Sequence, residues 1–219
     1  MKKLEKQELL FIILTAVLFV IGRLGVLIWP EQNGILVAGK ILISIEIILF
    51  AVLFYLQKKT NFGLFIMITV ILYCLADAII NIYFPAAMAL FAAGHIVFLI
   101  GSLRNNHHLK LWQILTCAVL AVIILVGLII FRARVPKGLV VPIVCYMLLL
   151  FAAMLSSFNK GRLLSIGYIL FTISDAMLAV KTAFPKTNAY MSHIVLAVYY
   201  VAVILITLRI LRKQNFIQR

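Results

Sequence analysis

Charged residues are scarce in this sequence, and most of the few that occur are basic. Only 12% of the 219 residues are charged, whereas 66% are hydrophobic. Water-soluble domains are about half apolar and about a quarter charged, because polar groups must cover their surface. This shortage of charge excludes a water-soluble globular fold and favours a protein surrounded by lipid. The length allows one domain, so we expect residues 1–219 to form a single polytopic membrane domain.

Cysteine is also sparse, and the common catalytic signatures do not occur. The three cysteines, Cys74, Cys117 and Cys145, have no CxxC spacing, so we interpret them as small packing residues. The sequence contains no HExxH, GxSxG or P-loop pattern, which argues against the protease, lipase and nucleotide-driven designs that use them. We predict no metal and no other cofactor. The basic residues form no clustered face with aromatic residues, which argues against nucleic-acid binding.

What the sequence has instead is a series of long hydrophobic runs. A span needs about 20 apolar residues, and its backbone polar groups must be satisfied internally, so we expect an all-α membrane protein with eight transmembrane helices. The predicted spans are residues 9–29, 35–56, 62–83, 86–103, 111–131, 139–157, 163–182 and 190–211. The first run is too long for a removed signal peptide, and Arg23 interrupts it. Short connectors with Pro, Gly and Asn predict antiparallel neighbours.

The surplus of basic residues predicts an orientation. If the N-terminus is cytoplasmic, thirteen basic residues fall in cytoplasmic segments and five on the opposite side. The thirteen are Lys2, Lys3, Lys6, Lys58, Lys59, Arg104, Lys110, Lys160, Arg162, Arg209, Arg212, Lys213 and Arg219; the five are Arg132, Arg134, Lys137, Lys181 and Lys186. This asymmetry favours cytoplasmic N- and C-termini. We therefore expect a multi-pass protein of the cell (plasma) membrane.

A weak internal repeat relates the two halves of the chain. An Asp-Ala pair at 77–78 is followed 18 residues later by His-Ile-Val at 95–97, and the same pattern recurs at 175–176 and 193–195. Spans one to four are therefore predicted to be duplicated as spans five to eight, although so few identities can also coincide by chance. The predicted halves are residues 1–107 and 108–219. Since spans three and seven run in the same direction, the two four-helix repeats would be parallel, with the two aspartates at equivalent depth.

The ionisable residues inside the spans are the candidates for chemistry. Each costs roughly 2.5–3.5 kcal/mol at the bilayer centre, so we expect them to face a polar interior and to pair with one another. We hypothesise that Asp77 and Asp175 are a catalytic pair. The residues expected to support them or to bind substrate are Lys40, His95, Tyr199, Tyr200, Ser174, Glu46 and Arg23. The two bases, Arg23 and Lys40, nearly balance the three acids of this group.

Structural roles are the alternative for the same residues. Each aspartate could pair with Arg23 or Lys40 and merely hold helices together. A single histidine on an apolar helix, such as His95, is more often a hydrogen-bonded packing residue than a catalyst. Tyr199 and Tyr200 could equally be interfacial or packing residues.

Several segments in this order resemble the YhhN family, which includes the lysoplasmalogenases. The segments are residues 75–80, 91–98, 167–179 and the Tyr-Tyr pair at 199–200. The most specific is Phe-x-x-Ser-Asp-x-x-Leu-Ala at 171–179, and Gly94-His95 and Lys40 also fit. The sequence departs from the family pattern at three positions: Ala76 replaces a glycine, Ile41 a proline and Val203 a glutamine.

The resemblance implies eight spans and hydrolysis of the vinyl ether bond of lysoplasmalogens, giving a fatty aldehyde and glycerophospho-ethanolamine or glycerophospho-choline. Such a bond is hydrolysed through protonation at carbon and capture of an oxocarbenium ion by water. This chemistry needs one protonated acid and one anionic group, as in glycosidases. Two aspartates suit it, one kept protonated by burial and repulsion and the other kept ionised by Lys40 or Arg23. The residues do not indicate which aspartate has which role.

A non-enzymatic protein is the competing interpretation. Duplicated four-span halves with acids near the midplane are also features of small-solute transporters, and a lipid-binding membrane protein would share the composition. A closed cavity beside the aspartates would favour the enzyme, and a continuous polar path would favour transport. On the enzyme hypothesis the partners are a lysophospholipid substrate and membrane lipids. The sequence indicates no oligomeric state.

Overall fold

The computed structural model describes residues 3–28, 33–104, 110–130, 137–183 and 189–212, and it is helical throughout these ranges apart from turns. It has eight α-helices and one short 3-10 helix. The α-helices are α1 (Lys3–Ile28), α2 (Asn33–Lys58), α3 (Asn61–Ile79), α4 (Phe84–Leu103), α5 (Leu111–Ile130), α6 (Val140–Ser157), α7 (Arg162–Ala183) and α8 (Ala189–Leu208), and the 3-10 helix η2 spans Lys137–Leu139. The predicted all-α class is confirmed.

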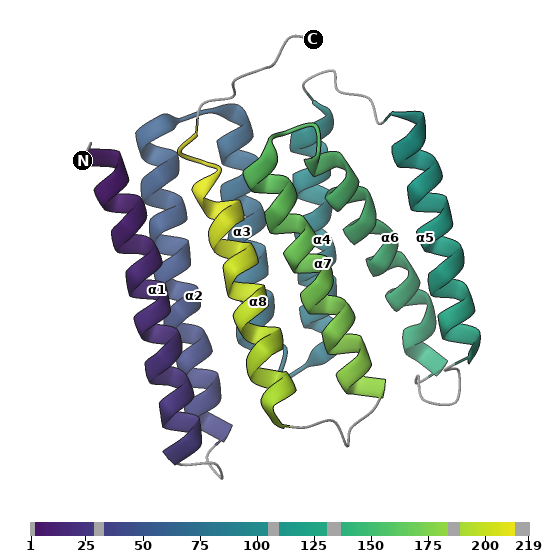
Figure 1. Cartoon of the computed structure of the whole chain (residues 1–219), viewed down its shortest axis with the longest axis horizontal. Helices are drawn as coiled ribbons and strands as arrows, with labels where there is room; N and C mark the ends of the chain where they lie inside the picture. Colours follow the sequence, from purple (N-terminus) through teal and green to yellow (C-terminus); the bar gives the residue numbers. More distant parts are fainter. Residues whose placement is uncertain (1–2, 29–32, 105–109, 131–136, 184–188, 213–219) are drawn as a thin grey trace.

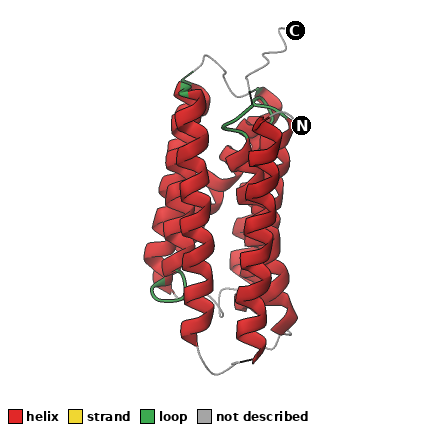
Figure 2. Ribbon diagram, turned by 90° about the vertical axis from the view of Figure 1, so that its left-hand side faces the viewer, coloured by secondary structure: helices red, strands yellow, loops and turns green. Residues whose placement is uncertain are grey.

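The helices form an upright bundle in which chain neighbours run antiparallel. Figure 1 shows α2, α3 and α4 behind α8 and α7, with α5 and α6 at one side and α1 at the other. Figure 2 shows that the helices lie in two layers. Since the helices alternate in direction, α1 begins and α8 ends at the same end of the bundle, which we call the terminal end. The opposite end is called the distal end.

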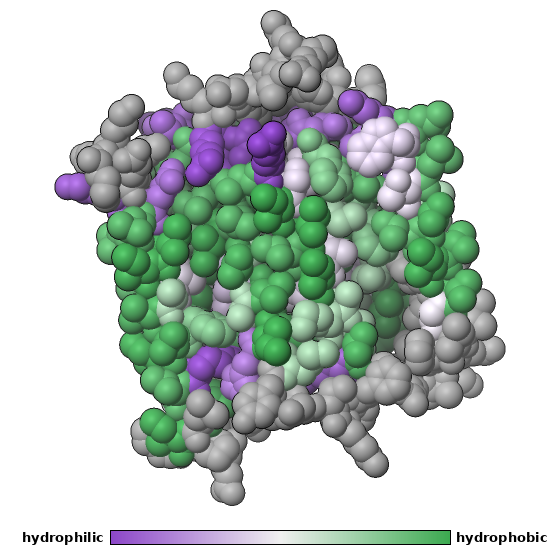
Figure 3. Space-filling view, viewed as in Figure 1, coloured by the Kyte–Doolittle hydropathy of each residue, from purple (hydrophilic) through white to green (hydrophobic). Residues whose placement is uncertain are grey.

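The outer surface of the bundle is suited to lipid. Seven of the described helices are long and apolar enough to cross a membrane. The remaining one, α5, contributes a shorter apolar stretch, Leu111–Leu120. Large apolar side chains such as Leu10, Ile21 and Leu49 lie on the outside. Figure 3 shows the resulting apolar band across the middle, with hydrophilic residues gathered at the terminal end. The chain is a multi-pass membrane protein, because no aqueous fold exposes such a band.

Helix boundaries follow local capping chemistry rather than the limits of the hydrophobic runs. The side chain of Thr60 accepts a hydrogen bond from Gly63 N (3.0 Å) and starts α3. That helix ends at Ile79, four residues before the predicted end. Pro85 lies in the first turn of α4 rather than in a connector, because proline needs no hydrogen-bond acceptor for its nitrogen there. In addition, α1 starts six residues earlier than predicted, and α8 ends at Leu208 instead of the predicted residue 211.

The arrangement of the helices is compatible with the predicted parallel repeat. In each predicted half, consecutive helices pack as neighbours, and the closest pairings are α3 with α4 and α7 with α8. Across the halves, α4 packs on α6 and α8 packs on α2, so equivalent helices make equivalent crossings. The direction of α1 equals that of α5 (Figure 1). The repeat itself remains a prediction.

The cysteines differ from one another in their surroundings. Cys74 is 2% exposed and packs in the core, as predicted. Cys145 is free and lies on the outer surface of α6, so the packing interpretation is wrong for this residue. A side chain of this size is compatible with an apolar surround whether it faces protein or lipid.

Candidate functional site

A layer of aromatic rings crosses the bundle where α3, α4, α7 and α8 meet. The ring centroids of Tyr73 and Phe171 are 4.7 Å apart, and Tyr199 lies 5.5 Å from Phe171. His95 lies 5.1 Å from Tyr73. These four side chains are at most 5% exposed. We call them the ring layer.

The ring layer depends on one close helix approach. A Cβ atom at Gly94 would lie only 2.4 Å from Tyr73 Cε1, so the ring rests directly on the backbone of α4. This contact brings the Tyr73 hydroxyl within 2.6 Å of His95 Nδ1. Tyr168 OH completes the polar group at 3.1 Å from Tyr73 OH. Glycine at position 94 is therefore required by packing, and His95 is held by Tyr73 rather than by either aspartate.

Asp77 lies one turn beyond the ring layer on α3 and has a full set of polar partners. Lys40 Nζ from α2 lies 2.9 Å from Asp77 Oδ1. The Tyr200 hydroxyl from α8 donates to Asp77 Oδ2 at 2.7 Å. Asp77 and Lys40 are 4% and 8% exposed. A buried carboxylate with an ammonium and a phenol at its two oxygens is compensated as an anion, so Asp77 is ionised.

Asp175 occupies the matching position on α7 with different partners. The Tyr146 hydroxyl from α6 donates to Asp175 Oδ2. No cation lies within ion-pair distance of Asp175 in the described ranges, where Lys40 and Asp77 form the sole ion pair. Asp175 is partly exposed and Ala176 beside it is exposed. A carboxyl group in apolar surroundings without a cation is favoured in its neutral, protonated form.

The two aspartates lie at one level of the bundle without touching. Each follows a ring-layer residue by four positions, Tyr73 on α3 and Phe171 on α7, and these two rings are in contact. Since both helices run in the same direction, Asp77 and Asp175 each lie about 6 Å beyond that contact. The predicted equivalent depth follows from this register. No direct contact joins the two carboxyl groups.

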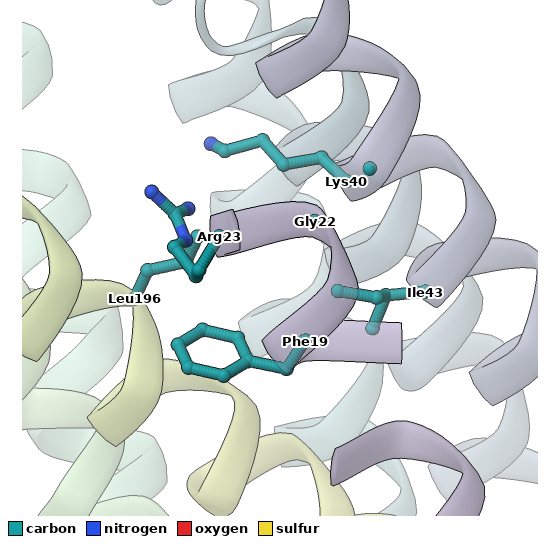
Figure 4. A pocket seen from close by; sticks show the side chains of 7 residues that line it. Phe19, Gly22, Arg23, Lys40, Ile43 and Leu196 are labelled. Atoms are coloured by element: carbon teal, nitrogen blue, oxygen red, sulfur yellow. The ribbon is translucent and has the colours of Figure 1, made fainter. Parts of the chain in front are cut away.

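A small hollow opens beside the ion pair. It is lined by residues of α1, α2 and α8, including Phe19, Arg23, Lys40 and Leu196. Figure 4 shows the charged ends of Arg23 and Lys40 extending into the same space. Gly22 and Gly39 form part of the wall, where the backbones of α1 and α2 approach closely.

Arg23 pairs with no acid among the residues that the structure describes. Its NH1 lies 3.3 Å from His193 Nδ1, and its guanidinium group lies 5.6 Å from the ring centroid of Phe19. Within the described ranges the expected charge-balanced network is therefore smaller than predicted. In those ranges Lys40 and Asp77 alone form an ion pair, and the charged end of Arg23 extends into the hollow.

Three predicted support residues join helices instead. Glu46 accepts a hydrogen bond from Thr15 at 2.9 Å between α1 and α2, and it touches neither aspartate. Ser174 donates to the carbonyl oxygen of Val195 at 3.0 Å and ties α7 to α8. Tyr199 also makes a tether, because its hydroxyl donates to Tyr73 O at 3.0 Å. Of the predicted set, Lys40 and Tyr200 are the residues that the fold brings to Asp77.

Sequence reasoning missed three tyrosines. Tyr146 is the partner of Asp175, and Tyr73 and Tyr168 form the polar group with His95. Tyr73 could have been found, because it precedes Asp77 by one helical turn and so shares its face. Tyr146 has no such signal, since its contact depends on how α6 is rotated against α7.

The arrangement suits acid–base chemistry on an uncharged group. It provides a carboxylate paired with Lys40, a second carboxyl group at the same level with no cation beside it in the described ranges, and the guanidinium group of Arg23 beside the ion pair. Within the described residues no group of three or more His, Cys, Asp or Glu side chains could hold a metal ion.

Comparison with known families gives one match. The profile of the YhhN family matches residues 37–210, a segment that holds Lys40, both aspartates and all the tyrosines named above. No curated protein and no solved structure matches the chain.

Proposed function

The chain belongs to the YhhN family, and from this membership and the site geometry we propose that it hydrolyses the vinyl ether bond of lysoplasmalogens. The observation that carries the proposal is the difference between two carboxyl groups at one level. Asp77 has a counter-ion, and Asp175 has none among the residues that the structure describes. Hydrolysis of a vinyl ether needs this combination, an acid that can give a proton and an anion that remains charged.

Asp175 is the proton donor in this proposal. Its proton goes to the vinyl carbon that is bonded to the alkyl chain and not to oxygen, and the C=C electron pair forms the new C–H bond. The resulting positive charge is shared between the other vinyl carbon and the ether oxygen. Tyr146 keeps its hydrogen bond to the Asp175 carboxylate formed in this step and so stabilises that charge.

Water completes the reaction. It adds to the positively charged carbon and gives its proton back to Asp175, forming a hemiacetal. The hemiacetal hydroxyl then loses its proton as the ether oxygen gains one. The bond between the hemiacetal carbon and the ether oxygen breaks, and this releases the fatty aldehyde and glycerophospho-ethanolamine or glycerophospho-choline. Asp77 stays ionised throughout and provides negative potential at the level where the cation forms.

The basic groups of the hollow fit the other end of such a substrate. Arg23 and Lys40 line the hollow beside Asp77, and a guanidinium group with free donors is suited to a phosphate diester. The alkenyl chain would extend along apolar helix surfaces. The proposed partner is thus a membrane lysophospholipid with a choline or ethanolamine head group.

The location of the site supports an enzyme better than a transporter. The ring layer lies on the terminal-end side of both aspartates and is almost fully buried. A closed layer at this point is an obstacle to a continuous polar path. We further propose that the terminal end is cytoplasmic in the plasma membrane, so that the site faces the outer leaflet.

The test is an aldehyde-release assay on the purified protein in lipid nanodiscs. We expect aldehyde from an alkenyl lysophospholipid and none from its saturated alkyl ether, which cannot be protonated at carbon. Asp77→Asn and Asp175→Asn should each abolish most of the release. Full activity in both variants would contradict the assignment. Uptake of a solute into vesicles by a protein without hydrolytic activity would favour the transporter.

A further inference from the structure

Two basic side chains are buried together at the terminal end, far from the aspartates. Lys160 lies in the turn between α6 and α7 and is 6% exposed. Arg209 follows the last residue of α8 and is 8% exposed. Both lie against one ring, with Lys160 Nζ at 5.4 Å and Arg209 Cζ at 5.8 Å from the centroid of Phe62. Basic residues at helix ends normally reach into water, so this burial needs a reason.

Arg209 has a structural role that accounts for part of its burial. Its Nε donates to the carbonyl oxygen of Lys160 at 3.0 Å, and its NH1 donates to the carbonyl oxygen of Arg212 at 2.6 Å. These bonds join the α6–α7 turn to the end of α8. They use neutral acceptors, so they leave the charge of Arg209 uncompensated.

Lys160 has no comparable role for its ammonium group. Its Nζ is buried and has no hydrogen-bond partner among the residues that the structure describes. No carboxylate pairs with Lys160 or Arg209 in those ranges. Burial, together with the positive charge of Arg209, lowers the pKa of Lys160 to about 8. Burial and the charge of Arg212 lower the pKa of Arg209 in the same way.

Two adjacent buried cations without a counter-ion are unfavourable, because each loses hydration and repels the other. The cation–π contacts with Phe62 offset only a part of this cost. An anion from outside the chain would offset more. The position at the ends of α6 and α8 is the depth at which lipid phosphates lie. The N-termini of α3 and α7 lie at the same end and add favourable potential for an anion.

We propose that Lys160 and Arg209 form a binding site for a phosphate group, carried by an anionic phospholipid of the leaflet at the terminal end. Lys160 Nζ supplies donors that nothing in the described chain uses, and Arg209 supplies the second charge. Gly161, with φ +114°, leaves the turn without a side chain next to Arg209. The site is separate from the hollow near Arg23, so the two can be tested independently.

The test measures thermal unfolding of the purified, delipidated full chain in a neutral detergent. One arm adds short-chain phosphatidylglycerol, with phosphatidylcholine as the comparison. The other adds inorganic phosphate, with chloride at equal ionic strength as the comparison. The variants are Lys160→Met, which keeps the packing against Phe62, and Arg162→Gln, which removes an exposed basic residue from the same end.

We expect phosphatidylglycerol to raise the unfolding temperature of the wild type and of Arg162→Gln. In Lys160→Met the apparent affinity should be weaker by about tenfold or more, the usual effect of losing one charged hydrogen bond. Without additive, Lys160→Met should unfold at the same temperature or higher, because an uncompensated charge has been removed. A response to phosphatidylglycerol but not to millimolar phosphate identifies a lipid. An equal response to both identifies a phosphate site that is not specific for lipid.

Equal shifts in wild type and Lys160→Met in both arms would overturn the proposal, as would loss of the shift in Arg162→Gln alone. If Lys160→Met does not fold, Arg209→Lys takes its place, since it keeps the charge but removes the planar donors. Identification of co-purified lipid by native mass spectrometry gives a second reading. The wild type should retain phosphatidylglycerol more strongly than the variant, and equal retention would also overturn the proposal.

Discussion

Asp77 and Asp175 have similar sequence surroundings but opposite electrostatic ones. Each precedes an alanine, lies one turn beyond a ring-layer residue and accepts a hydrogen bond from a tyrosine. Asp77 is enclosed and paired with Lys40, whereas Asp175 is partly exposed and has no cation beside it in the described chain. The neighbours from other helices, not the local sequence, decide which carboxyl group is charged.

The largest effect should come from the aspartate without a cation. Asp175→Asn keeps the size of the side chain and an acceptor for Tyr146 but cannot give a proton. We expect aldehyde release to fall by about 10²- to 10⁴-fold, the usual contribution of a general acid, with stability changed by no more than about 1 kcal/mol. Steady-state kinetics and thermal unfolding of the same preparation measure both. Unchanged kinetics would show that Asp175 is not the acid.

The second prediction concerns the ion pair. Asp77→Asn or Lys40→Met alone leaves one buried partner uncompensated and should destabilise the protein by roughly 3–5 kcal/mol. The double variant removes both charges and should be more stable than either single variant. Unfolding of the four proteins in detergent gives the coupling. If the losses of unfolding free energy in the two single variants add up in the double variant, Lys40 and Asp77 do not form an ion pair in the purified protein.

The third prediction tests the ring layer, which lies on the terminal-end side of both aspartates. Gly94→Ala places a Cβ 2.4 Å from the ring of Tyr73, so α4 or the ring must move, at a cost of about 1–3 kcal/mol. Activity should fall too, because Tyr73 precedes Asp77 by one turn. Gly127→Ala is the control, since nothing lies within 4 Å of a Cβ built there. That control should be neutral or stabilising, and similar behaviour of the two variants would contradict the packing argument.

The smallest effects should distinguish the two carboxyl groups most directly. Tyr200→Phe removes a hydrogen bond to an ionised Asp77 and should cost about 1.5–3 kcal/mol, whereas Tyr146→Phe removes one from a neutral Asp175 and should cost about 0.5–1.5 kcal/mol. Both substitutions delete only a hydroxyl group, so each is the control for the other. Thermal unfolding provides the measurement. The reverse order would exchange the charge states that we assign.

The sequence predicted the features that depend on one helix at a time. The eight hydrophobic runs, the antiparallel neighbours and the matched aspartates all follow from composition and period. Helix ends were less accurate, since Pro85 starts α4 instead of separating it from α3. That difference arises from capping, which a hydrophobic run does not show.

The part of the site that the sequence predicted is the contact between two buried opposite charges. Lys40 and Asp77 pair because buried opposite charges must meet, and the sequence holds few candidates. The contact of Tyr146 with Asp175 and that of Glu46 with Thr15 could not be predicted, because they depend on the rotation of one helix against another. Lys160 was assigned to the basic surplus of one membrane face, and nothing local indicates that it is buried.

The short length of α3 affects the supply of water. This helix has 19 residues, whereas α1 and α2 have 26 each, so it is about 10 Å shorter. In Figure 1 the turn after α3 stops above the lower ends of α1 and α2. Asp77 lies two residues from the end of α3. Each turnover of the proposed reaction consumes one water molecule, and the early end of α3 shortens the distance that water must travel from the interface through an otherwise apolar protein.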